Sequence, residues 1–278
     1  MKILHLTDIH LDHLYLEAIQ RYCRRLKQEA PDIVVITGDI SNANLISEHL
    51  LVLRKELAPC PVFFVAGNHD FYNGSIEEVR AEFSSHCTYI GPAKTTPSGE
   101  GAYWLGSSGV IHLSETHALI GIDGWYDGGY ADWFKSQLDM NDYYLIKELS
   151  GPMIQTRQER FNALQRLSAA SADYIQVQLQ TAFDSGYTTC YVATHVPPFR
   201  ESSVYNGKIS DNTWLPHFSS KKMGDALKLV CLANPNKQAI VLCGHTHGAS
   251  TYLPLKNLTV ICGAAEYGNP GIANVINI

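Results

Sequence analysis

The sequence predicts an α/β fold, because buried strands alternate with amphipathic helices in its first part. Apolar runs at residues 2–8, 31–39 and 60–70 are separated by two segments with apolar residues at helical spacing. Strands and helices alternating at this length are typical of a core with buried strands. The 278 residues, 45% hydrophobic and 17% charged, have a globular composition. Without repeats, low-complexity tracts or linkers, we expect a single domain spanning residues 1–278.

The remaining elements follow from changes in periodicity along the chain. Leu16, Ile19, Cys23 and Leu26 mark a helix over 14–29, and Ile46, Leu50, Leu53 and Leu57 mark a second helix. Residues 88–122 hold short apolar runs between Gly/Ser turns, a pattern that predicts strand–turn–strand structure. We interpret residues 125–185 as a mainly helical insertion that stops at Gly186. Strands at 188–195 and 238–243 and a helix near 221–233 complete the prediction.

Charge and cysteine usage narrow the class of protein. The net charge of −6 argues against a chain that binds nucleic acid through nonspecific phosphate contacts. Seven cysteines without a C-x-x-C pair argue against a disulfide framework. The sequence shows neither a signal-peptide pattern nor an apolar run near the roughly 20 residues of a membrane span. We therefore expect a cytoplasmic protein that does not enter a membrane.

Polar residues with metal-binding chemistry follow five of the predicted strands. The motifs are Asp8-Ile9-His10, Gly38-Asp39, Gly67-Asn68-His69-Asp70, His195 and Gly244-His245-Thr246-His247. Ligands of open α/β sheets bind beyond the carboxyl ends of the strands, so these motifs should share one rim. Each motif alone is weak, since a single strand-end histidine is more often structural. All five together favour a metal site.

Backbone geometry gives the spacing of these motifs a reason. Side chains at i and i+2 of an extended segment point to the same face, so Asp8 and His10 should reach one ion. His245 and His247 should likewise share one side of their loop. The glycines let the backbone turn sharply or approach the site closely. Oxygen and imidazole donors without thiolate suit Mn, Fe, Zn, Co or Ni better than Mg²⁺.

The five motifs, in this order, resemble the calcineurin-like metallophosphoesterase superfamily. Its pattern of D-x-H, G-D, G-N-H-D/E, H and G-H-x-H is present from residue 8 to residue 247. The resemblance implies a two-sheet β-sandwich flanked by helices, which also accommodates the strand-rich segment that follows the α/β start. It implies two divalent metal ions as cofactors.

The resemblance also implies roles for individual residues. Asp8, His10 and His247 correspond to ligands of the first metal, and Asn68, His195 and His245 to ligands of the second. Asp39 corresponds to the carboxylate that bridges both metals. His69 corresponds to the histidine that contacts the phosphate or protonates the leaving group, and Asp70 would orient His69 by a hydrogen bond. The implied reaction is hydrolysis of a phosphodiester or phosphomonoester by a metal-bridging hydroxide.

The substrate is expected to be a small molecule or nucleotide carrying a phosphate ester. "GDISNAN" lacks the Asp-Arg-Gly of the protein Ser/Thr phosphatases, and His69 replaces the arginine usual in lipid A precursor hydrolases. The branch of cyclic nucleotide phosphodiesterases and small phosphoesterases remains. A nuclease acting on DNA or RNA is an alternative that the acidic charge disfavours, and a non-catalytic scaffold is another. The sequence leaves the oligomeric state open.

Three residues outside the motifs are candidates for substrate binding. Arg200, after "HVPPF", could donate two hydrogen bonds to a phosphate or remain a solvated loop charge. Trp214 and His217, in "NTWLPHF", could stack on a base or pack their loop against the protein.

Overall fold

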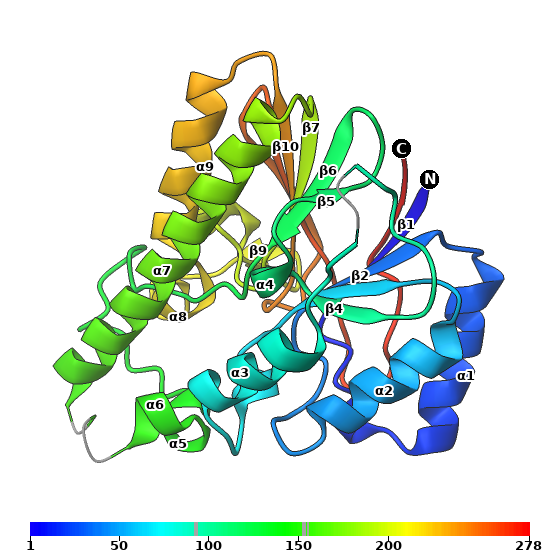
Figure 1. Ribbon diagram of the computed structural model, residues 1–278. Helices are drawn as coiled ribbons and strands as arrows, with labels where there is room; N and C mark the ends of the chain where they lie inside the picture. Colours follow the sequence, from blue (N-terminus) through cyan, green and yellow to red (C-terminus); the bar gives the residue numbers. More distant parts are fainter. Residues whose placement is uncertain (92–93, 152–153, 155) are drawn as a thin grey trace.

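Two β-sheets packed face to face form the centre of the protein, with helices on their outer sides (Figure 1). This computed structural model describes residues 1–91, 94–151, 154 and 156–278. The two-sheet sandwich flanked by helices that the sequence predicts is therefore confirmed. Parts of the predicted segments 88–122 and 125–185, namely residues 92–93, 152–153 and 155, lie outside the described residues.

The first sheet has the strand order β13-β1-β2-β3-β4. The strands are β1 (Lys2–Leu6), β2 (Ile33–Thr37), β3 (Val62–Val65), β4 (Ala102–Trp104) and β13 (Asn274–Asn277). β1 to β4 run parallel, whereas β13 is antiparallel to β1. The carboxyl ends of β1, β2 and β3 therefore meet at one edge of the sheet.

The second sheet has the order β11-β12-β10-β7-β6-β5. The strands are β5 (Ile111–His112), β6 (His117–Gly121), β7 (Thr189–Ala193), β10 (Gln238–Cys243), β11 (Ser250–Leu255) and β12 (Leu258–Cys262). β6, β7, β10 and β12 run parallel, while β5 and β11 are antiparallel to their neighbours. A separate hairpin consists of β8 (Val204–Tyr205) and β9 (Lys208–Ile209).

Alternating side chains of each strand fill two different apolar layers. In β2, Ile33 and Val35 pack between the sheets, whereas Val34 and Ile36 belong to the larger core that the outer helices cover. The layer between the sheets also holds Phe63 of the first sheet and Leu242 of the second. Successive residues of a strand point to opposite faces, so strands covered on both faces read as continuous apolar runs. This is why "IVVIT" contains no alternation.

Each sheet has its own set of covering helices (Figure 1). α1 (Leu16–Gln28), α2 (Ile46–Leu57) and α3 (Ile76–His86) lie along the first sheet, and α7 (Arg157–Asp184) and α9 (Lys221–Ala233) along the second. Short helices lie in the connections: η1 (Leu11–His13), η2 (His69–Phe71), α4 (Leu105–Ser108), α5 (Asp142–Leu145), α6 (Lys147–Ser150), η3 (Arg200–Ser202) and α8 (Leu215–Phe218).

The long helix α7 has clear start and stop signals. Thr156 and Glu159 form a reciprocal capping box at its beginning. At its end Gly186 has a φ of 100° and its amide donates to the carbonyl of Phe183, so the helix ends where the sequence predicts. Residues 125–141, ahead of α5, consist of turns and irregular backbone.

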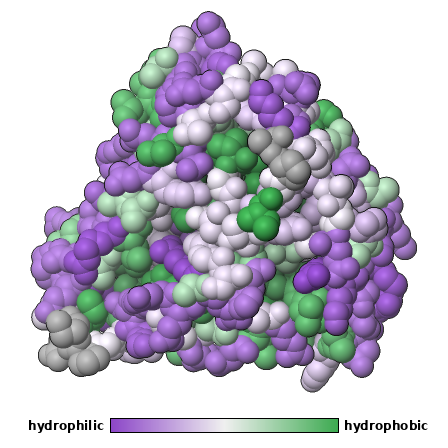
Figure 2. Space-filling view, viewed as in Figure 1, coloured by the Kyte–Doolittle hydropathy of each residue, from purple (hydrophilic) through white to green (hydrophobic). Residues whose placement is uncertain are grey.

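The surface is mixed in character. Figure 2 shows hydrophilic residues along the edges of one face and separate hydrophobic patches between them. In the described part of the chain, no helix is both long enough and apolar enough to span a membrane.

The buried imidazole of His5 joins three strands of the first sheet and makes stability sensitive to pH. It contacts Thr37 Oγ1 at 2.9 Å and Asn274 Nδ2 at 3.0 Å. Burial lowers the pKa of His5 to about 4. In the unfolded chain, His5 takes up a proton as the pH falls below 6.5. In the folded chain it stays neutral until about pH 4. The contribution of neutral His5 to the free energy of unfolding is therefore fully present above pH 6.5, and it is lost as the pH falls from 6.5 to about 4.

We predict that His5→Gln reduces the acid sensitivity of the metal-free protein. One proton taken up on unfolding costs about 1.4 kcal/mol per pH unit, so His5 should account for about 2 kcal/mol of lost stability between pH 7 and pH 5. Urea unfolding of both proteins at the two pH values measures this difference. Equal slopes of stability against pH in wild type and variant would contradict the assignment to His5.

Candidate metal centre

The five motifs lie together at the carboxyl ends of strands from both sheets. Asp8 and His10 follow β1, Asp39 follows β2, and Asn68 follows β3. His195 follows β7, and His245 and His247 follow β10. Within each sheet, backbone bonds tie neighbouring loops together, such as Asp8 N to Gly38 O and Gly244 N to His195 O. The two sheets are joined at the rim by the amide of His245, which donates to the carboxylate of Asp8 at 3.1 Å. The predicted common rim therefore exists in the fold.

The backbone at this rim differs from the extended geometry that the sequence argument used. Asp8, His10, Asp39, His245 and His247 all have positive φ values, between 39° and 69°. From this left-handed backbone, Asp8 and His10 reach one set of candidate ligands, whereas His245 and His247 belong to two different sets. Such conformations cost free energy in non-glycine residues and persist where surrounding contacts impose them. Such a concentration of strained residues is typical of functional sites.

Glycines allow these loops to approach each other closely, as the sequence predicts. A Cβ on Gly67 would lie 2.1 Å from Asp39 Oδ1. A Cβ on Gly244 would lie 1.8 Å from Thr7 Oγ1 and 2.2 Å from Asp8 Oδ2. Any larger residue at either position would displace a carboxylate of the rim.

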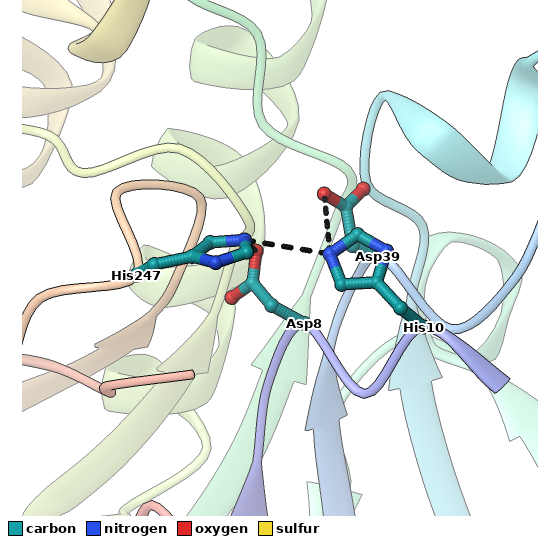
Figure 3. Close-up of side chains that lie close together, drawn as sticks. All are labelled: Asp8, His10, Asp39 and His247. Carbon is teal, nitrogen blue, oxygen red and sulfur yellow. Dashed lines mark hydrogen bonds and ion pairs between the residues drawn. The ribbon is translucent and has the colours of Figure 1, made fainter. Parts of the chain in front are cut away.

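The first group of candidate ligands consists of Asp8, His10, Asp39 and His247 (Figure 3). Each offers one donor atom, and all four atoms lie within 4.8 Å of one another. His10 Nε2 lies 3.4 Å from His247 Nε2 and 3.9 Å from Asp39 Oδ2, while His247 Nε2 lies 3.4 Å from Asp8 Oδ1. These spacings leave room for one cation between the four side chains.

The second group consists of Asp39, His195 and His245, with Asn68 beside them. His195 Nε2 lies 3.4 Å from Asp39 Oδ1, 3.2 Å from His245 Nδ1 and 3.1 Å from Asn68 Oδ1. Asp39 belongs to both groups, with Oδ2 toward the first and Oδ1 toward the second. A carboxylate shared in this way is suited to bridge two cations.

The remaining nitrogens of the second group make the hydrogen bonds expected of metal ligands. His195 Nδ1 donates to the carbonyl of Thr37 at 2.8 Å, which leaves Nε2 for the site. His245 Nε2 donates to the carbonyl of His217 at 3.0 Å, which leaves Nδ1 for the site. Imidazoles that bind metals commonly donate their second N–H in this manner. The donor set therefore fits a divalent metal.

The electrostatics of the rim also favour bound cations. Burial would raise the pKa of Asp39, but His195 and His69 hold it well below its ordinary value. Burial would lower the pKa of His195, but Asp39 and Asp8 raise it to about 10. Burial lowers the pKa of His10 and of His245 to about 4, so these imidazoles stay neutral and able to coordinate. Cations would neutralise two buried carboxylates at the rim.

His69 is placed on the open side of the rim. Its Nε2 lies 4.0 Å from Asp39 Oδ2, its backbone amide donates to Asp39 Oδ1 at 2.9 Å, and its side chain is 21% exposed. Its ring stacks on Tyr72 with centroids 4.2 Å apart. It therefore lies beside a candidate metal ligand with part of its side chain open to solvent.

Asp70 does not make the hydrogen bond to His69 that the sequence argument assigns to it. Its Oδ1 accepts from the backbone amides of Ile40 and Ser41 at 2.8 and 2.7 Å, and Oδ2 accepts from Gly67 N at 2.8 Å. The carboxylate is fully buried under these amides. Asp70 thus braces the loops that carry Asp39 and Asn68, and the orienting role is a misassignment.

The three candidates for substrate binding have different surroundings in the structure. Arg200 is exposed at the start of η3, and its side chain forms no hydrogen bond or ion pair with the residues described. Trp214 is 46% exposed and packs edge-on against Phe218, whose ring stacks on His245. The Phe218 ring therefore lies between Trp214 and the second group of candidate ligands.

The side chain of His217 is engaged inside the protein, which favours packing of its loop over contact with substrate. Its side chain is buried, and both ring nitrogens have partners, Tyr143 Oη at 2.6 Å and Ser136 Oγ at 3.1 Å. Only its backbone carbonyl reaches the site, where it accepts from His245.

Two residues near the rim were not predicted from the sequence. The Tyr267 ring lies 4.4 Å from that of His10 and 4.8 Å from that of His247, and the residue is 51% exposed. Asp142 of α5 is fully buried and accepts a hydrogen bond from Asn68. Neither belongs to a strand-end motif, so no spacing pattern could have identified them.

Known proteins match this chain in sequence and in fold. Two curated relatives, uncharacterized metallophosphoesterases of Campylobacter jejuni and Helicobacter pylori, are 33% and 32% identical over 82 and 77 residues. These segments cover 28% and 27% of this chain but only 22% and 21% of the relatives.

Solved structures share the fold at low identity. A dimetal phosphatase from Danio rerio has a TM-score of 0.54 at 14% identity, with 95% of this chain and 87% of that chain covered. A protein of Thermus thermophilus has a TM-score of 0.51 at 14% identity, with coverages of 95% and 88%. The family model for calcineurin-like phosphoesterases matches residues 1–249. The chain therefore belongs to the calcineurin-like phosphoesterase family.

Proposed function

We propose that this chain is a dinuclear-metal phosphoesterase. Asp8, His10 and His247 would hold the first metal and Asn68, His195 and His245 the second, with Asp39 between them. One observation carries the proposal: Asp39 takes part in two separate groups of candidate ligands, one on each of its oxygens. Mn, Fe, Zn, Co and Ni all suit this mixture of oxygen and imidazole donors.

Two such metals, when bound, supply an activated water and positive charge for in-line displacement at phosphorus. The chain's own contribution is positional. Strained loops and the braces from Asp70 hold the ligands in place, so little reorganisation accompanies the reaction. His69, on the open side, would donate a proton to the departing alkoxide.

The substrate we propose is a small phosphodiester or phosphomonoester with a flat group, such as a nucleotide. Two exposed rings support this proposal. Tyr267 lies beside the first group of ligands, and Trp214 lies beyond Phe218 at the second. A base bound by its phosphate at the metals could stack on either ring, and stacking on aromatic side chains is worth about 1–3 kcal/mol per base.

We also retain two wider proposals about the whole chain. Residues 1–278 would form one domain, with the segment around 125–185 as an insertion whose α5 reaches the rim through Asp142. The protein would work in the cytoplasm, which is supported by seven cysteines that are all free.

The proposal is tested by hydrolysis of bis-p-nitrophenyl phosphate and p-nitrophenyl phosphate by metal-stripped protein reloaded with Mn²⁺. Activity should return with the metal, and Asp39→Ala should lower kcat by roughly 10³-fold or more, because losing the shared ligand removes several kcal/mol of charge stabilisation. The preference between the two substrates distinguishes diesterase from monoesterase activity.

The control for this experiment is metal content, measured on the same preparations. Wild type should hold two equivalents of Mn²⁺ and Asp39→Ala fewer. A wild-type protein that binds no Mn²⁺ would refute the metal centre and support a scaffold role. Two bound equivalents with full activity in Asp39→Ala would refute the bridging role.

His69→Ala is predicted to affect turnover without affecting metal binding. Losing a general acid typically costs about 10²–10⁴-fold, and the loss should grow as the leaving group becomes more basic, since a good leaving group needs no proton. A plot of kcat against leaving-group pKa for a series of aryl phosphates measures this dependence. Loss of bound Mn²⁺ in His69→Ala, or equal effects on all leaving groups, would count against the role.

A further inference from the structure

Asp142 is a buried carboxylate beside the second group of ligands. It is the first residue of α5, in the segment between β6 and α7, and its side chain has no exposure. Its Oδ1 accepts from Asn68 Nδ2 at 2.9 Å and from Tyr72 Oη at 2.6 Å. Its Oδ2 accepts from Tyr126 Oη at 2.8 Å. All three donors are neutral, and the described residues include no ion-pair partner for it.

A buried carboxylate held only by neutral donors is costly, so its retention requires a reason. The second group of ligands provides one, because a divalent cation there would face Asp142 across a single amide. Asn68 Nδ2 contacts Asp142, and Asn68 Oδ1 lies 3.1 Å from His195 Nε2, on the side of the proposed second metal.

Asp142 determines which way the Asn68 amide faces. Both oxygens of Asp142 accept hydrogen bonds, so the carboxylate pairs with the NH₂ group of Asn68 and not with its oxygen. The amide oxygen is thereby directed toward the metal. In the flipped amide, oxygen would face oxygen at Asp142, and an NH₂ group, which is no ligand, would face the cation.

Asp142 is also linked to His69 through Tyr72. Tyr72 donates to Asp142, receives a hydrogen bond from Asn68 Nδ2 at 3.2 Å and stacks on the His69 ring. The α5 segment is anchored to this region by backbone bonds, Asn73 N to Leu145 O at 2.8 Å and Lys147 N to Gly74 O at 3.0 Å. Asp142 is therefore held at a defined position relative to Asn68.

We propose that Asp142 is a positioning residue that sets the affinity of the second metal site by holding Asn68 with its oxygen toward the ion. This inference rests on the proposed dinuclear centre and concerns only one half of it. The first group of ligands makes no contact with Asp142, so its affinity should not depend on this residue.

The test is titration of metal-free protein with Mn²⁺ by calorimetry, with bound equivalents checked by elemental analysis. Wild type should bind two ions. Asp142→Ala should weaken the second site by about 10–100-fold, the usual effect of removing a partner of a metal ligand, and leave the first site unchanged. Asp142→Asn should lose less, because its amide oxygen can still accept from Asn68 and Tyr72.

Tyr126→Phe is the matched control for the hydrogen bond of Asp142 that does not involve Asn68. It removes one hydrogen bond from the same carboxylate but leaves Asn68 untouched, so both sites should keep their affinity. A double-mutant cycle with Asn68→Ala tests whether Asp142 acts through Asn68. If it does, Asp142→Ala should have little further effect on metal affinity in the Asn68→Ala background. Thermal melts confirm that each variant is folded, and Asp142→Ser, which leaves a smaller cavity, replaces Asp142→Ala if that variant does not fold.

The possible failures are distinguishable. A wild type that binds fewer than two Mn²⁺ ions would overturn the dinuclear centre itself. Two ions in wild type and undiminished second-site affinity in Asp142→Ala would overturn only the role of Asp142. An equal loss of affinity in Tyr126→Phe and Asp142→Ala would assign the effect to the buried hydrogen-bond network as a whole, not to the contact with Asn68, and would overturn the positioning role.

Discussion

The buried carboxylate of Asp39 is the point on which the rest of the site depends. It is 2% exposed and faces His10 through one oxygen and His195 through the other. It sits in a left-handed backbone conformation, one residue after a glycine that is also left-handed. A buried charge in a strained position requires strong compensation. The imidazoles on both sides, and the cations they would share, provide it.

The two sheets make this arrangement possible because their parallel strands end at the same rim. Four of the candidate ligands follow β1, β2 and β3, and the other three follow β7 and β10. Strands that are covered on both faces have fixed ends. The short loops that follow them can therefore be held in strained backbone conformations. Asp70 adds a brace between two of these loops by accepting from three backbone amides.

Much of the fold and the site was predictable from local patterns. The strands and long helices follow from periodicity, and the helix 221–233 and strand 238–243 were predicted with the observed bounds. The strand-end motifs identified Asp39 and the histidines around it. Side-chain partners were less predictable, because they depend on loops distant in sequence. Asp70 therefore has different neighbours from those expected, and only the structure decides that His217 packs its loop and does not face a substrate.

The sequence by itself determined which residue types stand at the strand ends and in what order, because strand periodicity and motif spacing are local properties. Only the tertiary structure decided which atoms face one another. It placed Asp142, 74 residues from Asn68, against that amide, and it brought Tyr267 over His10. It also showed that left-handed backbone, rather than extended strand, directs Asp8 and His10 to one point. Such choices depend on contacts between distant segments, which spacing along the chain does not encode.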